Sequence, residues 1–146
     1  MARVSTYLNF PNQTEAAFLF YRSVFNTGFG GQGIMRFGEM PAPEGTPPMS
    51  DAVKKLVIHV ELPILGGHVL MGTDAPPEMG FALTAGDNVH INLEPDTRAE
   101  TQRLFDALAE GGKVSQQLSE QFWGGFFGSL QDKFGIHWMF NCNARE

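Results

Sequence analysis

The chain has 146 residues, of which 42% are hydrophobic and 18% are charged, the composition of one globular domain. Its formal net charge of −6 excludes nucleic acid and anionic membranes as main partners, because both attract a basic surface. The single cysteine, Cys142, excludes an intramolecular disulfide and favours a reducing compartment. With no apolar leader and no run of ~18 apolar residues, we expect a cytoplasmic protein that does not enter a membrane.

The first half begins with an alternating strand and an amphipathic helix. Residues 3–10 alternate with period two, as in a half-buried strand. One face of this strand is apolar and the other carries Ser5, Tyr7 and Asn9. Residues 14–25 carry apolar side chains at helical spacing, and Asn12 or Thr14 is the expected N-cap.

The remaining elements are separated by turns rich in glycine and proline. A strand at 34–37 precedes an irregular loop at 39–51 with four prolines, which we interpret as a connector rather than a mobile lid. The first half then closes with two strands and a polar linker, at 56–62, 68–73 and 75–86. The second half follows with a strand, a helix that begins at Asp96 or Thr97, and three further strands: 89–93, 114–118, 123–130 and 136–141.

The chain nearly repeats itself. Without a gap, Tyr7–Gly28 lies over His90–Gly111, so that Asn9 meets Asn92 and Thr14 meets Thr97. This repeat predicts an α+β fold of two βαβββ modules, residues 1–74 and 87–146 of a single domain, that form a curved mixed sheet with the helices on its outer face. A groove between the two halves is the expected position of the functional site.

A glycine-rich segment at 28–33 matches the pattern G-x-G-x-x-G. That pattern binds a pyrophosphate only where it follows a strand and opens a helix, so that the helix amides face the ligand. Here it follows a helix and precedes a strand, and we interpret it as a helix end with a flexible turn. The order of elements also argues against a doubly wound methyltransferase.

The four histidines have different neighbours. His59 and Glu61 share one strand face and have the spacing of a chelating pair, although a polar pair on a sheet surface is the simpler interpretation. His68 and His137 are expected to be structural or exposed to solvent. His90 lies on the strand face away from the helix, where the groove is expected, and is either a ligand-binding or a hydrogen-bonded structural histidine.

The predicted ligand pocket combines polar and aromatic side chains. Its polar members are expected on the strand faces away from the helices: Ser5, Tyr7, Asn9, His90 and Asn92. In the aromatic cluster 122–127, alternation separates one pair of rings from another, and one pair suits the pocket while the other suits the core. We include Trp123 and Phe127 in the predicted pocket.

Several segments together resemble one family. Residues 18–25 (FLFYRSVF) resemble the first helix of the vicinal oxygen chelate superfamily, which includes glyoxalases, bleomycin-resistance proteins and extradiol dioxygenases. Four further motifs resemble its PhnB-like branch, at 59–76, 108–114 (LAEGGKV), 121–124 (QFWG) and 132–139 (DKFGIHWM). The resemblance covers nearly the whole chain and implies paired βαβββ modules, a pocket in the curved sheet and a homodimer. It also brings a methyltransferase label, for which the sequence offers no cofactor-binding residues.

The resemblance also implies a divalent metal with four ligands, one from each end strand of the two modules. Matched residue by residue, these ligands fall on Ser5, His90 and Met139, while the closing strand of the first module has no carboxylate. One strong ligand of four does not hold a divalent ion tightly. We therefore predict a protein that binds a small organic molecule without a tightly held metal. The alternative is a metal-dependent enzyme of the superfamily, of lyase, isomerase or dioxygenase type, in which His90 is a base or a partial ligand supplemented by Glu61 or Glu94.

Overall fold

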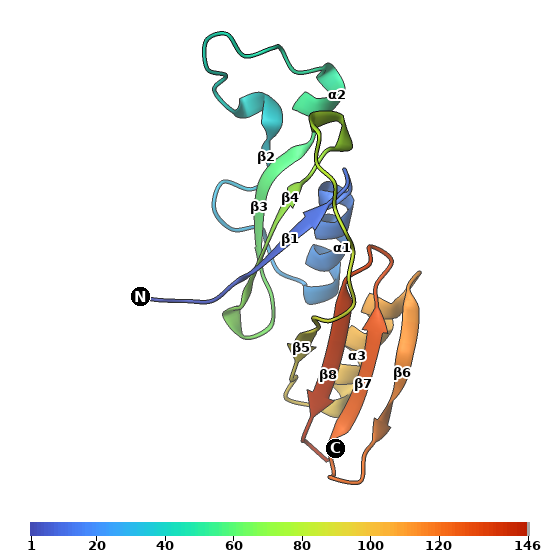
Figure 1. The fold of residues 1–146 in the computed structure, drawn as a ribbon. Helices are drawn as coiled ribbons and strands as arrows, with labels where there is room; N and C mark the ends of the chain where they lie inside the picture. The colour runs from blue at the N-terminus through green and yellow to red at the C-terminus, as the bar shows by residue number, and fades with distance from the viewer. Residues whose placement is uncertain (146) are drawn as a thin grey trace. The chain divides into compact units, whose positions relative to one another are not determined.

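The computed structural model describes residues 1–145, and the chain divides into two compact units, Met1–Thr84 and Ala85–Glu146. Each unit contains a four-stranded mixed sheet and one long helix (Figure 1). The predicted class, α+β with two βαβββ modules, is therefore confirmed. The boundary between the units lies within the predicted linker 75–86. No helix in the described part of the chain combines the length and apolar character that a membrane span needs.

The first unit has the strand order β1-β4-β3-β2. Its strands β1 and β4 are parallel, whereas β3 is antiparallel to both of its neighbours. Apart from the unpredicted short helix α2, the elements follow the predicted order: β1 (Thr6–Phe10), α1 (Thr14–Phe25), β2 (Met35–Arg36), α2 (Asp51–Lys54), β3 (Val57–Pro63) and β4 (Val69–Asp74). The helix α1 has the predicted bounds, because its apolar residues recur at helical spacing and Asn26 adopts the left-handed conformation at its end.

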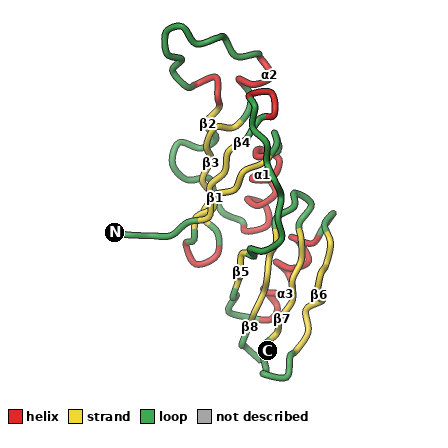
Figure 2. Tube along the Cα trace, in the orientation of Figure 1, coloured by secondary structure: helices red, strands yellow, loops and turns green. Residues whose placement is uncertain are grey.

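Three local predictions for this unit are wrong. Neither Asn12 nor Thr14 caps α1; the N-cap is Gln13, whose side chain makes no capping bond. The strand β2 has only two residues and passes into a short 3-10 turn at Phe37–Glu39. The proline-rich loop is followed by a four-residue helix, α2, which Ser50 caps by accepting a hydrogen bond from Val53 N (Figure 2).

A glycine in β4 allows the helix to approach the first sheet. A Cβ atom built on Gly72 would collide with the ring of Phe18 and lie 3.1 Å from Cγ2 of Thr14. Phe18 and its neighbour Tyr21 are fully buried against this face. The close approach closes one side of the sheet with aromatic side chains and leaves the opposite side without a helix.

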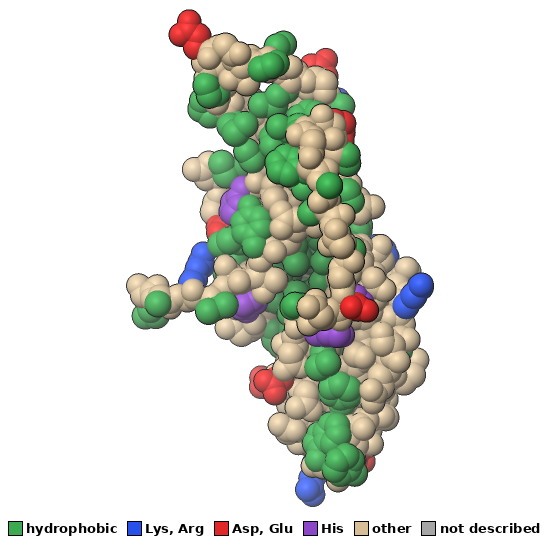
Figure 3. Space-filling view, viewed as in Figure 1, with side chains coloured by type: hydrophobic (Ala, Val, Ile, Leu, Met, Phe, Trp, Pro, Cys, Tyr) green, Lys and Arg blue, Asp and Glu red, His purple; other side chains and the backbone are tan. Residues whose placement is uncertain are grey.

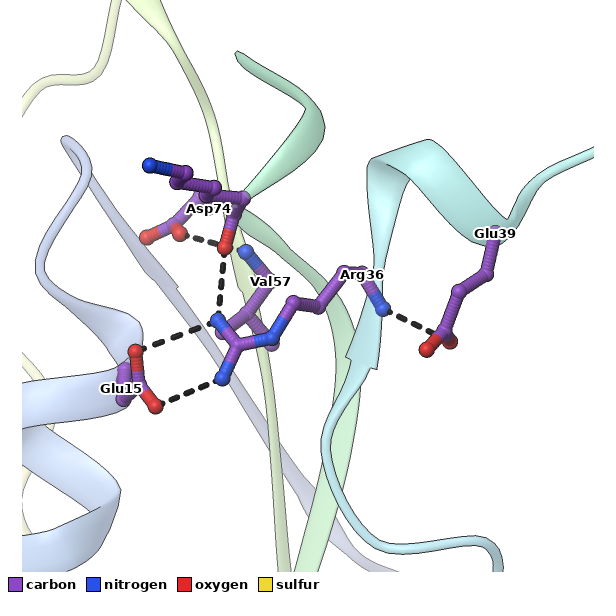
Figure 4. A network of polar contacts seen from close by, with 6 residues as sticks. Glu15, Arg36, Glu39, Val57 and Asp74 are labelled. Atoms are coloured by element: carbon purple, nitrogen blue, oxygen red, sulfur yellow. Dashed lines mark hydrogen bonds and ion pairs between the residues drawn. The ribbon is translucent and has the colours of Figure 1, made fainter. Parts of the chain in front are cut away.

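A polar network joins α1 to the strands of the first unit (Figure 4). The two terminal nitrogens of the Arg36 guanidinium, Nη1 and Nη2, donate to the carboxylate of Glu15 at 3.2 and 2.7 Å, and so link β2 to the first turn of α1. Nη1 of Arg36 also donates to the carbonyl oxygen of Lys55 at 2.7 Å. The buried Asp74 carboxylate accepts from Thr14 N and Val57 N at 2.9 and 2.8 Å, so it holds the starts of α1 and β3 to the end of β4.

The second unit repeats this architecture with the order β5-β8-β7-β6. Here β5 and β8 are parallel, and the other neighbours are antiparallel. Its elements are β5 (Ile91–Leu93), α3 (Arg98–Ala109), β6 (Lys113–Glu120), β7 (Phe126–Gln131) and β8 (His137–Cys142). Gly128 of β7 has the role that Gly72 has in β4, because a Cβ atom on it would lie 3.0 Å from the ring of Phe105 on α3.

All four strands of the second unit have ends that differ from the prediction by one to three residues, and the starts of β5 and β7 bear on the candidate site. Val89 lies before β5 and is 74% exposed, because β5 is limited to the three residues that pair with β8. Trp123 lies outside β7, in a turn that Gln121 N closes by donating to Gly125 O at 2.8 Å. Of the two predicted starts of α3, Asp96 and Thr97, the second is its N-cap, since the hydroxyl of Thr97 accepts from Glu100 N at 3.1 Å.

Candidate functional site

The face of the first sheet away from α1 carries polar side chains and methionines. Leu8 and Phe10 point toward the buried side, so the alternate residues Tyr7 and Asn9 point to the open side. Parallel pairing with β4 places Tyr7 beside Met71 and Asn9 beside Thr73. Three residues predicted for the pocket, Ser5, Tyr7 and Asn9, therefore share this face.

His59 and Glu61, for which a polar surface pair is the simpler interpretation, lie with Tyr7 on the open face of the first sheet. The hydroxyl of Tyr7 is 3.2 Å from Nδ1 of His59, and their rings are tilted with centroids 5.8 Å apart. Nε2 of His59 is 3.8 Å from Oε1 of Glu61, and a guanidinium nitrogen of Arg3 is 3.7 Å from the same oxygen. A chain of polar groups thus crosses from β1 to β3.

Tyr7 occupies a mixed environment. It is 48% exposed, yet burial of its inner part raises the pKa of the phenol above its ordinary value, and the hydroxyl of Thr73 opposes this with a smaller effect. The phenol is therefore protonated at neutral pH. Ser5 is half-buried and its hydroxyl contacts the sulfur of Met71 at 3.8 Å.

The glycine-rich segment 28–33 packs against this group. Gly30 N donates to the backbone oxygen of Glu61 at 2.9 Å. Gly31 has a φ of +57°, and a Cβ atom on it would lie 2.8 Å from Oε2 of Glu61. The absence of side chains here makes room for the Glu61 carboxylate, so the segment serves as a wall around an acidic side chain and does not open a helix.

The open face of the second sheet contains a pair of histidines. Parallel pairing of β5 with β8 places Asn92 beside Met139 and brings His90, just before β5, to His137. The two imidazole rings are tilted, with centroids 5.2 Å apart. His90 and Asn92 are exposed, while His137 is half-buried. Histidine side chains also reach the surface in the face of the molecule that Figure 3 shows.

The other end of this sheet is aromatic. Trp123 is 53% exposed and meets Phe127 edge-on at 6.1 Å between ring centroids. The predicted division of the cluster into a core pair and a pocket pair is wrong, because neither Phe122 nor Phe126 is buried. Phe122 is 98% exposed and contacts the other side of Trp123. Among the described residues, the buried Oδ1 of Asn141 has no hydrogen-bond partner, and it lies beside Gly125 next to this aromatic turn.

The structure thus sorts the seven predicted pocket residues into separate clusters. Ser5, Tyr7 and Asn9 belong to the first unit; the other four belong to the second, with Asn92 on the edge strand β5, His90 just before it and the aromatic pair near the start of β7. The predicted groove between the halves stays a prediction. Sequence reasoning missed the joining of His59 and Glu61 to Tyr7 and of His137 to His90. Matching strand faces across the paired strands β1, β4 and β3, and across β5 and β8, would have indicated both.

A hollow near the proline-rich loop has a different character. It is bordered mainly by glycine, proline and methionine, with Lys54 as its charged side chain: Gly38, Met40, Ala42, Thr46, Pro47, Pro48, Met49 and Lys54. It contains no pair of groups suited to acid–base or metal chemistry. The interpretation of this loop as a connector or a lid stays open.

The residues at the ligand positions implied by the superfamily do not fit a divalent metal. Ser5 contacts a methionine sulfur, the closing strand β4 offers Met71 and Thr73, and Met139 stands beside Asn92. Throughout residues 1–145, no three side chains of histidine, cysteine, aspartate or glutamate converge. Thioether and hydroxyl groups are poor ligands for the hard divalent ions, so these positions do not offer a set of ligands for such an ion.

Comparisons with known proteins agree with this architecture. The sequence profile of the family described as 3-demethylubiquinone-9 3-methyltransferase matches residues 2–140. The chain is 31% identical to Protein YjdN of Escherichia coli K12 over 150 residues, which cover 98% of this chain and 97% of that protein.

Solved structures give the same result. Protein PA1353 of Pseudomonas aeruginosa has a TM-score of 0.81 at 32% identity and covers 97% of this chain and 98% of its own. A PhnB protein of Bacillus cereus, titled a putative 3-demethylubiquinone-9 3-methyltransferase, has a TM-score of 0.73 at 25% identity, over 97% of this chain and 99% of its own. At 18% identity, a glyoxalase/bleomycin resistance/dioxygenase family enzyme of Burkholderia phytofirmans shares the fold, with a TM-score of 0.60 over 95% of this chain and 98% of its own. The chain therefore belongs to the PhnB, or 3-demethylubiquinone-9 3-methyltransferase, family within the glyoxalase/bleomycin resistance/dioxygenase-like fold.

Proposed function

We propose that this PhnB-like protein binds a small organic molecule on its open sheet faces, without a tightly held metal. The ligand-contacting residues of the proposal are those of the two clusters: Ser5, Tyr7 and Asn9 in the first unit, and His90, Asn92, Trp123 and Phe127 in the second. A cytoplasmic location and a homodimer belong to the same proposal. Sedimentation as a monomer at micromolar concentration would remove the dimer from it.

One observation carries the proposal. In the second unit, a half-exposed aromatic pair, Trp123 and Phe127, lies beside an amide oxygen of Asn141 that has no partner among the described residues. Ligand sites commonly combine apolar and aromatic surface with a few hydrogen-bonding groups that set the ligand's orientation. The arrangement suits a ring-containing molecule that packs against the exposed indole of Trp123. Asn92 on the edge strand β5 of the same sheet, and His90 just before it, add hydrogen-bonding groups.

Methyl transfer, which the names of the family and of the Bacillus cereus protein mention, is not part of the proposal. The glycine-rich segment 28–33 follows α1, leads into β2 and packs around Glu61, so its amides do not form the start of a helix. The aromatic pair Trp123 and Phe127 lies in the second unit and does not involve this segment.

Trp123 provides a direct test. The chain has two tryptophans, and Trp138 is fully buried with its indole N–H bonded to Asp132 at 2.9 Å. We would screen metabolites by thermal shift, in which a ligand stabilises by RT ln(1 + [L]/Kd). Each hit should change the fluorescence of Trp123 in the wild type and leave the Trp123→Phe variant, which retains only Trp138, without a spectral response.

Matched variants locate the binding. We expect His90→Ala and Phe127→Ala to weaken a hit at least several-fold, and Lys133→Ala, on the turn after β7, to leave the affinity unchanged. Hits with the same affinity in His90→Ala, Phe127→Ala and Trp123→Ala would contradict the proposal. Elemental analysis of protein purified without chelator covers the alternative, since stoichiometric metal that is lost in His90→Ala would favour a metal-dependent enzyme.

A further inference from the structure

We propose that Tyr7, His59 and Glu61 form a proton-relay site that takes the proton of an acidic hydroxyl group, such as a phenol or enol, on a bound molecule. The proposal rests on the proposed function, because it names the chemistry that the ligand offers to the first unit. Tyr7 contacts the ligand, His59 receives the proton, and Glu61 positions the imidazole.

The contacts of His59 define the direction of the relay. The Glu61 carboxylate lies on the Nε2 side of the ring, at 3.8 Å, and the Tyr7 hydroxyl lies on the Nδ1 side, at 3.2 Å. A negative carboxylate favours a proton on Nε2, which leaves the lone pair of Nδ1 for the proton of the Tyr7 hydroxyl. Met35, which pairs with His59 from β2, carries no charge.

Glu61 is held in place by the glycine-rich segment 28–33. Its carboxylate lies against Gly31, and the amide of Gly30 bonds its backbone oxygen. Arg3 approaches the same carboxylate oxygen at 3.7 Å from an exposed position. Glu61 is thereby aligned toward His59 before a ligand arrives, which is the role of the third group in serine–histidine–acid sites.

Tyr7 is the member that reaches the ligand. It is 48% exposed on the open face, whereas the side chains of His59 and Glu61 are 32% and 25% exposed. Because burial raises the pKa of its phenol, Tyr7 carries its own proton at neutral pH. A tyrosine that keeps its proton can pass it inward only if it receives another from outside.

The proposed transfer balances without a co-reactant. The ligand hydroxyl gives its proton to the Tyr7 oxygen as the Tyr7 proton moves to Nδ1 of His59. The products are a ligand oxyanion, a neutral Tyr7 and a charged imidazolium beside the Glu61 carboxylate. The reverse transfer returns the proton to the ligand, so the site acts as a base or as an acid.

A ligand-free measurement tests the orientation of the relay. We expect the ¹⁵N chemical shifts of neutral His59 to show the proton on Nε2, and Glu61→Gln to weaken that preference. His68, whose Nε2 lies 2.8 Å from the Thr6 hydroxyl, is the internal control and should be unaffected. A neutral His59 with its proton on Nδ1 would overturn the proposal.

The transfer itself can be followed with 4-nitrophenol, which absorbs near the visible range only when ionised. At one pH unit below its solution pKa, about one tenth of the free probe is ionised. We expect more than half of the bound probe to be ionised by the wild type. Tyr7→Phe and His59→Gln should lose this excess, and His68→Gln should keep it.

The outcomes separate the relay from the binding proposal. If 4-nitrophenol binds but keeps its solution ionisation, or if the excess survives in Tyr7→Phe and His59→Gln, the relay is wrong and ligand binding stands. If the probe does not bind at millimolar concentration, the relay proposal is overturned. The proposed function is then judged by the Trp123 screen, whose readout lies in the second unit.

Discussion

Helices α1 and α3 have the same length and follow the first strand of their modules, but their first N–H groups are satisfied by different means. In α3 the cap is local, since the hydroxyl of Thr97 accepts from Glu100 N three residues later. In α1 the residue at the aligned position, Thr14, leaves its own buried hydroxyl without a partner among the described residues, and its N–H is bonded by Asp74 from the end of β4.

This difference shows that a repeated sequence can retain a fold while its supporting bonds change. The first module replaces a cap within one turn by a carboxylate that also bonds Val57 N, so a single side chain holds two elements. The two modules can be compared experimentally, because both tyrosines lie in the first unit and both tryptophans in the second. Tyrosine near-UV dichroism and tryptophan fluorescence therefore report on different units.

The largest expected effect follows from Asp74→Ala. Two buried backbone donors lose their acceptor, and each such loss costs about 1–3 kcal/mol, so the free energy of unfolding should fall by about 2–6 kcal/mol. Urea denaturation followed by tyrosine dichroism measures the change. Asp74→Asn, which keeps one oxygen acceptor, should recover part of it. Equal stability of wild type and Asp74→Ala would show that the long-range cap is dispensable.

The next largest effect is expected from Gly72→Ala. A methyl group at this position collides with Phe18, and overpacking of a buried core costs about 1–3 kcal/mol. The control is Gly28→Ala, since a Cβ atom there meets nothing within 4 Å and its φ is not positive. Thermal denaturation should lower the midpoint of Gly72→Ala alone. A comparable loss in both variants would indicate a general intolerance to substituted glycine instead of close helix packing.

The same substitution at the two aligned threonines sharpens the comparison of caps. Thr97→Val removes the hydroxyl that caps α3 and should reduce stability by about 1 kcal/mol, measured by tryptophan fluorescence in urea. Thr14→Val replaces a buried hydroxyl without a partner by a methyl group, and the free energy of unfolding should stay equal or rise. The comparison is refuted if the two variants lose similar amounts.

The smallest effect concerns acid. The hydrogen bonds from Arg36 hold the pKa of Glu15 below its ordinary value. The folded pKa is below the unfolded value of about 4.3, so the stabilisation is present above that pH and is lost as pH falls through the folded pKa. Because Glu15 is half exposed, we expect less than about 1 kcal/mol. In stability measurements between pH 6 and pH 3, Glu15→Gln should flatten this decline.

Glu100 provides the matched comparison in the second module. Hydrogen bonds from Arg103, three residues along α3, also lower the pKa of Glu100. The pKa of both carboxyl groups is lowered, so both stabilise the fold above that pKa. The Glu100 pair lies within one helix, however, whereas Arg36 joins α1 to β2. Glu100→Gln should therefore change the acid dependence less than Glu15→Gln. A larger change in Glu100→Gln would place the more important ion pair inside the helix.

The sequence by itself determined the features whose signals are local. The bounds of α1, the start of α3 to within one residue and the inward side of β1 follow from apolar spacing and from the polar residues before each helix. The gap-free repeat determined that there are two βαβββ modules, because it places a strand followed by a 12-residue helix at the start of each half, although the strands of the two modules differ in length. It did not determine the ends of β5 and β7, since strand ends depend on the partner strand that supplies hydrogen bonds.

Only the tertiary structure decided which polar groups meet. Asp74 reaches Thr14 across 60 residues, and Tyr7 reaches His59 across 52, because β1 pairs in parallel with β4 and β4 pairs in turn with β3. His90 meets His137 by the parallel pairing of β5 and β8. A side chain's alternation along its own strand defines the face on which it lies, but the register between distant strands defines its neighbours, and that register is set by the packing of the whole module.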